Sequence, residues 1–438
     1  MALKTYHIPI GKGSQAVDLP EEKVIYDIHG NKAAIKPDLK AETLRAIRNP
    51  IGTKPLRELV KKGDTVAITA SDLTRPVRSK DFLPVILDEL NVAGVPDSDI
   101  CLVVATGTHR GHTPAEDLEV YGEEVVKRIK IYQHDCKAPD LVYKGETSRG
   151  TPIWQDARVS HADKIIITGG VSLHPFAGFG GGRKGVMPGV SGLKTINHNH
   201  LLALTDEVGG GCNPETICGR LDGNRVSEDM EEVCRALNPA FLVNVVFTPD
   251  GDVHEVVAGD WFKAHRQGCA DLFTMSKVPI DHKADVVIAS AGGAPKDTNL
   301  YQGTKAHMNA DFAVKDGGIL IVALDCPDIK EPPIFSKWIS MPGTLLEMEK
   351  AVRADFSIPA FVAFKTRCIC SRCRKTYLVT RPENFDFVKA TGEIPVATVA
   401  EAWELAQKEL AAEGKTNYDI IVMSHAAATF PVVQSKQL

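Results

Sequence analysis

The residues of this chain with the most evident chemistry lie in one segment, 174–200, which reads HPFAGFGGGRKGVMPGVSGLKTINHNH. Its two outer histidines, His174 and His200, are of the type that exchanges protons near neutral pH or ligates transition metals. Between them Lys184 lies within a run of glycines. Proton transfer, metal binding and amine chemistry are therefore all available in one short connection.

The glycine run predicts a loop that binds an anion. Its glycines are Gly178, Gly180, Gly181 and Gly182, which permit positive φ and let a ligand approach bare amides. Arg183 and Lys184 place two cations beside those amides, an arrangement that suits a phosphate. We therefore expect Gly180, Gly181, Gly182, Arg183 and Lys184 to bind a charged cofactor.

This loop matches neither of two familiar nucleotide-binding loops. A P-loop requires Ser or Thr after its lysine, whereas Gly185 follows Lys184. A dinucleotide fingerprint opens a helix directly after a strand. A strand is expected at 165–168, but the Met-Pro-Gly run at 187–189 interrupts any helix soon after the loop.

A second polar loop, SDLTRP at 71–76, follows an expected strand that ends at residue 70. Arg75 precedes a proline, which favours extended backbone, and its planar guanidinium could hold a carboxylate through two parallel hydrogen bonds. The alternative is that Asp72 caps a helix and pairs with Arg75 on the surface.

Further histidines carry candidate acid/base or metal chemistry. His109 lies in the loop GTHR at 107–110, after another expected strand, and is a candidate proton carrier. His112 has the same chemistry, and spacing does not separate the two. His198 and His200 could form a two-histidine metal site, although a standard zinc site needs three or four protein ligands.

The second half of the chain offers one polar run after a strand, at 292–305. Within it, Lys305 is a candidate cation for a substrate anion, and Tyr301 and Gln302 are candidate hydrogen-bonding residues. The alternative is a helix face with solvated polar side chains.

Three cysteines, Cys368, Cys370 and Cys373, form a CxCxxC pattern. Three thiols are one short of a closed zinc or iron–sulfur site, and no histidine follows closely. We interpret them as a surface cluster.

Buried β-rich runs alternate with helical stretches, which favours an α/β fold with largely parallel sheets. Helical periodicity is clearest at 81–93 and 399–413. The expected strands are 65–70, 100–105, 164–168, 242–247, 286–290, 319–323, 361–364, 377–380 and 420–423.

Two strand-like segments, 162–170 and 284–293, resemble each other, and each ends in a glycine pair that we expect in a loop. Open α/β sheets hold ligands in such loops. The resemblance of these segments suggests that the chain has two similar halves. The alternation of strand and helix patterns weakens near 268–283, before a new strand begins. We therefore expect an N-terminal α/β domain at 1–275 and a C-terminal α/β domain at 276–438.

Composition limits the class of protein. The 438 residues are 43% hydrophobic and 24% charged, typical of a globular protein of two domains. A net charge of −5 argues against nucleic acid as the main partner. The N-terminus resembles no signal peptide, no apolar run is long enough for a membrane span, and ten scattered cysteines are typical of reduced thiols. We expect a cytoplasmic enzyme.

Taken together, SDLTRP, GTHR, HPFAGFGGGRK, the Asn-His pair at 199–200 and the run 301–305 resemble the nickel-pincer-dependent lactate racemase family. The match extends over most of the chain, in order. The resemblance implies two α/β domains with largely parallel sheets that enclose an interdomain cleft. In that cleft the family holds a nickel-pincer nucleotide, a pyridinium-3,5-bisthiocarboxylic acid mononucleotide built by separate biosynthetic proteins.

The resemblance also implies a role for each matching residue. Lys184 is similar to the lysine that bonds covalently to the cofactor, and His200 to the nickel ligand. His109 and His174 resemble the acid/base pair that serves opposite faces of the substrate carbon. The substrate-binding set would then be Arg75 and Lys305 on the carboxylate, Asp72 as a polar partner, and Tyr301 and Gln302 as lining residues.

The implied activity is inversion of C2 of a 2-hydroxy acid, lactate or a larger one, through a planar 2-keto acid. One histidine removes the hydroxyl proton while hydride leaves C2, and the other returns a proton after the acyl group has turned. Two alternatives stay open: an NAD- or zinc-dependent dehydrogenase or hydrolase, and a non-catalytic carrier of the nickel nucleotide.

Overall fold

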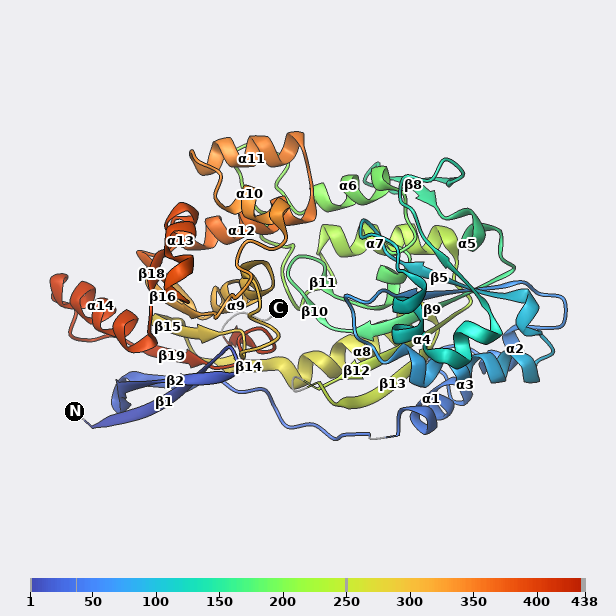
Figure 1. The fold of residues 1–438 in the computed structure, drawn as a ribbon, viewed down its shortest axis with the longest axis horizontal. Helices are drawn as coiled ribbons and strands as arrows, with labels where there is room; N and C mark the ends of the chain where they lie inside the picture. The colour runs from blue at the N-terminus through green and yellow to red at the C-terminus, as the bar shows by residue number, and fades with distance from the viewer. Residues whose placement is uncertain (1, 37, 249–250, 435–438) are drawn as a thin grey trace. The chain divides into compact units, whose positions relative to one another are not determined.

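The computed structural model describes residues 2–36, 38–248 and 251–434. The chain divides into two compact units. The C-terminal unit comprises Met1–Asn31, Leu204–Asn213 and Ser276–Leu438, and the N-terminal unit comprises Lys32–Ala203 and Pro214–Met275. Each unit has its own sheet (Figure 1).

The N-terminal unit is built on a six-stranded sheet in which five neighbouring strands are parallel and one edge strand, β13, is antiparallel. In spatial order the strands are β13 (Val253–Gly259), β12 (Phe241–Phe247), β9 (Lys164–Val171), β4 (Val66–Ser71), β5 (Ile100–Ala105) and β6 (Lys130–Gln133). The central strands are continuous apolar runs because helices and loops cover both of their faces.

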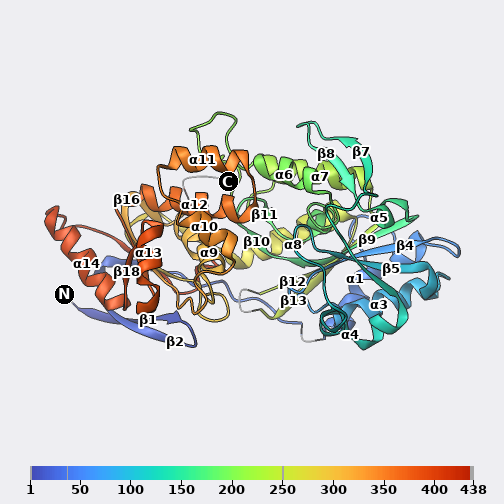
Figure 2. The same ribbon diagram turned by 45° about the horizontal axis from the view of Figure 1, so that its top comes forward.

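Helices on one face of this sheet form its larger core (Figure 2). They are α1 (Leu39–Arg48), α3 (Ser79–Val92) and α4 (Pro114–Arg128). Ile47, Phe82 and Tyr121 from these helices are fully buried against the strands. A capping box between Thr113 and Glu116 begins α4, so the loop that carries His109 runs into a fixed helix end.

The other elements of this unit include the segment that carries the glycine run. They are α2 (Leu56–Leu59), η2 (Asp97–Asp99), β7 (Val142–Glu146), β8 (Pro152–Gln155), α5 (Ala157–His161), β10 (Leu173–His174), β11 (Gly178–Phe179), η3 (Gly182–Gly185), α6 (Leu193–Leu201), α7 (Arg225–Leu237) and α8 (Trp261–Ser276). Cys269, Leu272 and Met275 of α8 pack with Val171 and Phe179 in a second core.

The C-terminal unit has a six-stranded parallel sheet. In spatial order its strands are β18 (Ile394–Val396), β17 (Lys375–Val379), β16 (Val314–Ala323), β15 (Ala284–Ser290), β19 (Ile420–Met423) and β3 (Val24–Asp27). The edge strand β3 comes from the N-terminal end of the chain.

Two layers cover this sheet. The hairpin of β1 (Leu3–Ile10) and β2 (Gly13–Pro20) packs with α14 (Val399–Ala412) in one core, through residues such as Ile8, Leu19 and Trp403. Helices α9 (Leu300–Ala310) and α12 (Ile358–Arg372) pack on the strands and on each other. The remaining elements are η1 (Glu21–Lys23), β14 (Lys277–Ile280), α10 (Pro333–Ile339), α11 (Leu345–Ala354), η4 (Pro382–Asn384), α13 (Phe385–Thr391) and β20 (Phe430–Val433).

The α/β fold with largely parallel sheets is confirmed, and two local expectations are wrong. The run 361–364 lies inside α12, whose cap is Ser357 and whose first turn contains Pro359. Gly169 and Gly170 continue β9 and pair with β12, so they do not form a loop. A short apolar run does not by itself distinguish a buried strand from a buried helix.

The division of the chain differs from a single break after residue 275. Met1–Asn31 belongs to the C-terminal unit, because its hairpin packs in that core and β3 pairs with β19. Leu204–Asn213 joins the same unit, where Glu349 of α11 accepts hydrogen bonds from the amides of Gly209 and Gly211.

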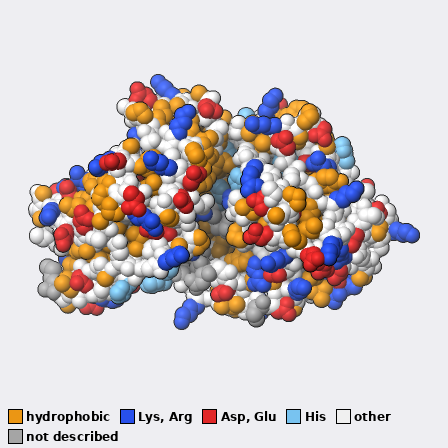
Figure 3. Space-filling view, in the orientation of Figure 1, with side chains coloured by type: hydrophobic (Ala, Val, Ile, Leu, Met, Phe, Trp, Pro, Cys, Tyr) orange, Lys and Arg blue, Asp and Glu red, His pale blue; other side chains and the backbone are white. Residues whose placement is uncertain are grey.

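Basic and acidic side chains are interspersed over the visible face (Figure 3). Over the described residues, no helix combines the length and apolar character required to span a bilayer.

Candidate functional site

The predicted site residues of the N-terminal unit come from loops at the carboxyl ends of neighbouring strands. Asp72 and Arg75 follow β4, and His109 follows β5, its parallel neighbour. His174 and Lys184 follow β9, which pairs with β4 on the other side. The carboxyl end of such a sheet is where α/β folds bind ligands.

Asp72, which is buried, and His109, which is exposed, form a hydrogen-bonded pair. The Nδ1 of His109 lies 2.6 Å from Oδ2 of Asp72, while Thr74 donates from its amide and hydroxyl to Oδ1. Burial raises the pKa of Asp72, but the hydrogen bonds from His109 and Thr74 outweigh burial and hold that pKa below its ordinary value. An ionised Asp72 fixes the proton of His109 on Nδ1 and leaves the lone pair on Nε2, where a base is needed.

His112 has a different environment, although its sequence context is similar. Its Nε2 accepts from the amide of Leu73, its Nδ1 lies 3.0 Å from Asp117, and its ring stacks on Tyr121. Its side chain is 0% exposed, against 46% for His109. Both nitrogens of His112 are therefore used inside the protein, and His109 is the candidate proton carrier.

Arg75 is exposed, and its guanidinium donates to the carbonyl and hydroxyl of the preceding residue, Thr74. Its charge lowers the pKa values of His174 and Lys184, so it acts on both groups. Asp72 caps no helix here, because its carboxylate accepts from Thr74 in a local turn. The alternative of a surface helix cap is therefore wrong, and Arg75 retains donors for an anion.

His174 ends the short strand β10 and is half-buried. Its Nδ1 accepts from the amide of Ala177 at 3.2 Å, which places the proton of the neutral ring on Nε2. Burial, and then the charges of Lys184 and Arg75, lower the pKa of His174 well below its ordinary value. A bound anion would reverse the effect of those cations, because it stabilises the protonated ring.

Lys184 lies in η3, directly after the glycine run. Burial, together with the charges of Arg183 and Arg75, lowers its pKa well below the ordinary value. A lysine with a lowered pKa presents a neutral amine, which is the nucleophilic form. The environment therefore suits covalent chemistry at Nζ.

His200 is fully buried in α6, and its Nδ1 donates to the carbonyl of Ile196 at 2.8 Å. The lone pair consequently lies on Nε2, and a backbone carbonyl on the other nitrogen is the usual support of a metal-bound imidazole. Burial, and then the charge of Lys184, lower the pKa of His200 to about 3, so the ring is neutral. Phe176 lies edge-on to His174 and His200, with ring centroids 4.6 and 5.3 Å away.

The two-histidine metal site at 198–200 is not formed. The Nδ1 of His198 lies 2.9 Å from the hydroxyl of Thr151, which in turn donates to Asp229. His200 faces Phe176 instead. Two positions along a helix are 200° apart, so these side chains diverge.

The glycines of this loop allow close packing within the protein, and their predicted contact with a cofactor stays a prediction. A Cβ on Gly181, at φ +72°, would lie 2.8 Å from the carbonyl oxygen of Gly170, and one on Gly182 would overlap His265. The amide of Gly182 donates to the side chain of Asn244. These glycines allow the loop to pack against its own protein, and Gly180 similarly packs on Ser172.

Arg183 is likewise engaged within the fold. Its guanidinium is fully buried and donates to the carbonyls of Ala177 and Phe179 and to the hydroxyl of Ser227. In this structure the guanidinium of Arg183 therefore bonds to groups of its own protein, and cofactor binding by Arg183 stays a prediction. Arg183 holds the loop that positions Lys184.

In the C-terminal unit, the predicted residues lie on the first two turns of α9. Asn299 caps this helix by accepting from the amide of Gln302, and Lys305 donates to the side chain of Gln302 at 3.0 Å. Lys305 is exposed, and the ring of Tyr301 packs on Phe335 at 5.3 Å. The helix thus presents a cation and an amide together.

The three cysteines of the CxCxxC pattern do not act as one cluster. Cys368 hydrogen-bonds with Cys212, while Cys370 lies beside His307 and Glu393. The interpretation as a surface cluster does not hold for Cys370. Sequence spacing gave no signal for this group, because its members come from three distant segments.

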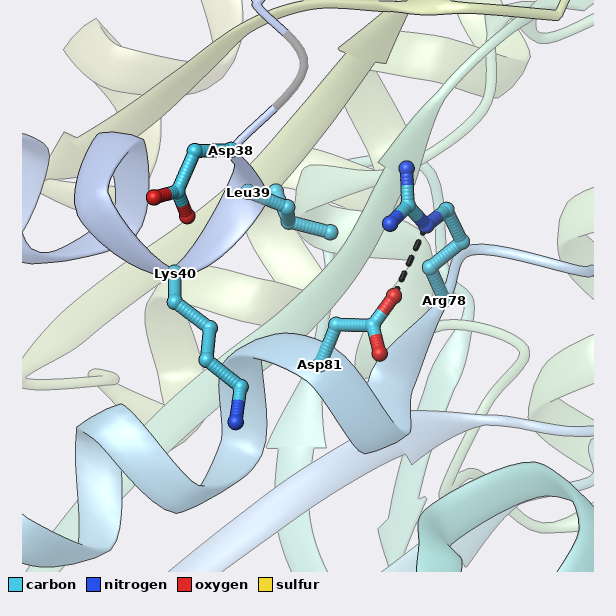
Figure 4. Close-up of a pocket in the computed structure, with 5 residues that line it drawn as sticks. All are labelled: Asp38, Leu39, Lys40, Arg78 and Asp81. Atoms are coloured by element: carbon cyan, nitrogen blue, oxygen red, sulfur yellow. Dashed lines mark hydrogen bonds and ion pairs between the residues drawn. The ribbon is translucent and has the colours of Figure 1, made fainter.

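A shallow hollow between the first turns of α1 and α3 is lined by charged residues (Figure 4). Arg78 donates to Asp81 across it at 2.8 Å. Its lining residues are Asp38, Leu39, Lys40, Arg78 and Asp81. None of the predicted site residues lies there.

Comparison with known proteins gives consistent matches over both units. The model of the lactate racemase N-terminal domain matches residues 10–210, and that of the lactate racemase C-terminal domain matches residues 280–428. Lactate racemase of Thermoanaerobacterium thermosaccharolyticum is 30% identical over 419 residues, which cover 94% of this chain and 96% of that protein. Lactate racemase of Lactiplantibacillus plantarum is 35% identical over 286 residues, 65% of each.

Solved structures agree with these matches. The lactate racemase apoprotein of T. thermosaccharolyticum aligns with a TM-score of 0.87 and 29% identity over 98% of this chain and 100% of that one. A Thermotoga maritima protein aligns with a TM-score of 0.63 and 15% identity over 91% of this chain and 99% of its own, which shows a shared fold alone.

Proposed function

The chain belongs to the lactate racemase family, and from this premise we propose that it is an isomerase that inverts C2 of a 2-hydroxy acid, with lactate as the first candidate. The observation that carries the proposal is that one unit places a base, an acid and a nucleophilic lysine after the carboxyl ends of β5 and β9, the two strands that flank β4. His109, His174 and Lys184 are those groups.

Inversion requires a group that removes the hydroxyl proton and a group that returns a proton from the other side of the keto acid. His109 supports the first role, because Asp72 holds its proton on Nδ1 and leaves Nε2 free to accept. His174 is the candidate for the second role: its ring is neutral in the free protein, and a bound anion that offsets the nearby cations favours the protonated ring, which can donate a proton. In the reverse direction the two roles exchange. Each transfer would contribute about 10²–10⁴-fold to the rate.

The substrate carboxylate needs fixed positive charge. Arg75 offers a planar guanidinium with donors free of any carboxylate partner among the described residues, and Lys305 offers an ammonium on α9. We propose that both bind the carboxylate, with Gln302 and Tyr301 beside it. Holding the carboxylate lets only the acyl group turn, which lowers the entropic cost of the reaction.

The residues present fit the nickel-pincer nucleotide. Lys184 would hold it covalently, because its neutral amine is the form that acylates. His200 would ligate nickel through Nε2, because Ile196 occupies Nδ1 and the ring stays neutral. When bound, this group would supply the acceptor and donor of the C2 hydride.

The chemistry of the thiols supports a reducing compartment. All ten cysteines are free in the structure, as is typical of cytoplasmic proteins. We place the protein in the cytoplasm, where the proteins that build the cofactor would act on it.

The decisive experiment is peptide mass spectrometry on protein produced together with the cofactor-biosynthesis proteins and nickel. We expect a nucleotide-sized adduct on the peptide that contains Lys184, and loss of optical activity when the protein is incubated with one enantiomer of lactate. Lys184→Ala should abolish the adduct. An unmodified Lys184 in active protein would reject the covalent role, and bound NAD or stoichiometric zinc at the site would favour a dehydrogenase or hydrolase.

A further inference from the structure

A second group of metal-binding side chains lies in the C-terminal unit, far in sequence from the residues discussed above. His307 of α9, Cys370 of α12 and Glu393 between α13 and β18 each offer one ligand atom, and these atoms lie within 4.8 Å of one another. Among the residues that the structure describes, no other group of three histidine, cysteine or carboxylate side chains brings its ligand atoms this close together.

Two members of the group, His307 and Glu393, are buried, Cys370 is partly buried, and the hydrogen bonding of the group is incomplete. The side chains of His307 and Glu393 are 0% and 1% exposed, and Nε2 of His307 lies 2.8 Å from Oε1 of Glu393. Thr391 donates to Oε2 of Glu393. Among the residues that the structure describes, however, Nδ1 of His307 is buried without a hydrogen-bond partner. Buried polar atoms without a partner are rare in native proteins, and an unoccupied ion site is one of their explanations.

The donor atoms favour one class of metal. A thiolate, an imidazole and a carboxylate are the ligands of zinc and similar borderline metals, whereas calcium and magnesium prefer oxygen alone. The charges also balance, because a thiolate and a carboxylate neutralise a divalent cation in a buried site.

We propose that His307, Cys370 and Glu393 bind a zinc-type divalent cation, with a water molecule in the fourth position. Binding replaces the proton of the Cys370 thiol by the metal and releases that proton to solvent.

The metal would hold three elements of the C-terminal unit together. It ties α9 to α12 and to the segment that enters β18, three elements that are distant in sequence. His307 lies two residues after Lys305, so the metal fixes the helix that carries the proposed substrate-binding cation. The site itself does not depend on the proposed racemase activity.

The test is a cobalt titration of the full chain, produced without the cofactor-biosynthesis proteins and dialysed against a chelator. We expect one equivalent of Co²⁺ to give thiolate-to-cobalt charge-transfer absorption in the near ultraviolet, and Zn²⁺ to displace it. Cys370→Ser should abolish this absorption. Cys368→Ser, which removes a thiol from the same helix, should retain it, and so should His200→Ala, because His200 brings no thiolate.

Absence of the absorption in the unsubstituted protein would overturn the proposal, as would its persistence in Cys370→Ser or its loss in Cys368→Ser. If Cys370→Ser does not fold, Glu393→Gln preserves the shape of the side chain and removes its charge. We expect that variant to bind Co²⁺ at least about 10–100-fold more weakly. An unchanged affinity would equally overturn the proposal.

Discussion

Among individual residues, two histidine–aspartate pairs in the N-terminal unit show how environment decides chemistry. His109 pairs with Asp72, and His112 pairs with Asp117. Only His109 keeps a nitrogen available, because the amide of Leu73 occupies Nε2 of His112. The pairs therefore provide a matched test of the proposed base.

We predict that Asp72→Asn lowers the racemisation rate of cofactor-loaded protein by about 10²–10⁴-fold, since an amide no longer holds the proton of His109 on Nδ1. The adduct on Lys184 should form normally. Asp117→Asn is the control, expected to lower stability more than turnover. Equal losses of turnover in the two variants, measured by polarimetry, would argue against His109 as the base.

Arg75 allows a test of carboxylate recognition. Arg75→Lys keeps the charge but loses the planar pair of donors, so we predict a rise in KM of roughly tenfold with a smaller change in kcat. Arg110→Lys, which alters an exposed arginine paired with Glu116, should leave both constants nearly unchanged. A KM unaffected by Arg75→Lys would remove Arg75 from the substrate site.

Sequence reasoning selected residue types that suit the proposed chemistry but could not assign a role to each of them. Nothing in the spacing separates His109 from His112, because their difference lies in the contacts of Leu73 and Tyr121. Arg183 looked like a ligand-binding cation because it follows glycines. Its carbonyl partners come from the folding of its own loop, which no local pattern encodes.

Among the structural elements, the glycine loop at 178–182 positions Lys184. We predict that Gly181→Ala lowers stability by more than about 1–2 kcal/mol and reduces adduct formation, because its φ of +72° is strained for alanine and the Cβ would meet Gly170. Gly150→Ala is the control: its φ is +77°, with nothing within 4 Å of a Cβ. Thermal unfolding and mass spectrometry of both variants measure the loss of stability and the loss of adduct. Equal destabilisation of the two variants would indicate backbone strain alone, and a larger effect of Gly181→Ala would indicate loss of loop packing.

Prediction of the elements was most accurate where the hydrophobic pattern was long or bounded by polar turns. The strands at 100–105 and 420–423 were placed with their observed bounds, as β5 and β19. The run 361–364 was wrongly predicted as a strand because α12 is buried at five consecutive positions, 360–364, which hides the helical period. The Ser357 cap was the signal that could have identified the helix.

For the whole molecule, the division of the chain depends on contacts that join distant segments. Residues 1–31 complete the C-terminal sheet through β3 and cover it with the β1–β2 hairpin. The apolar residues of this hairpin predict that it packs against a hydrophobic core. They do not predict which of the two sheets provides that core. Residues 1–31 were therefore predicted to belong to the N-terminal domain, which follows them directly in the sequence.

The two units should respond differently to acid, because buried neutral histidines are concentrated in the N-terminal unit. His200 and His265 are buried, and burial lowers the pKa of each to about 3. In the unfolded chain a histidine titrates near 6.5. Between these values the unfolded state binds more protons than the folded state, so the free energy of unfolding falls as pH falls.

Carboxylates with lowered pKa values, such as Asp285 in the C-terminal unit, lose their contribution only below about 4. Between pH 6.5 and about 4 we therefore predict selective loss of stability in the N-terminal unit of the cofactor-free protein. Hydrogen–deuterium exchange, corrected for the intrinsic effect of pH, should show α6 and α8 losing protection before β15 and β16. His265→Gln should flatten this pH dependence, since one proton-binding group is removed. Simultaneous loss of protection in both units would show instead that they unfold as one.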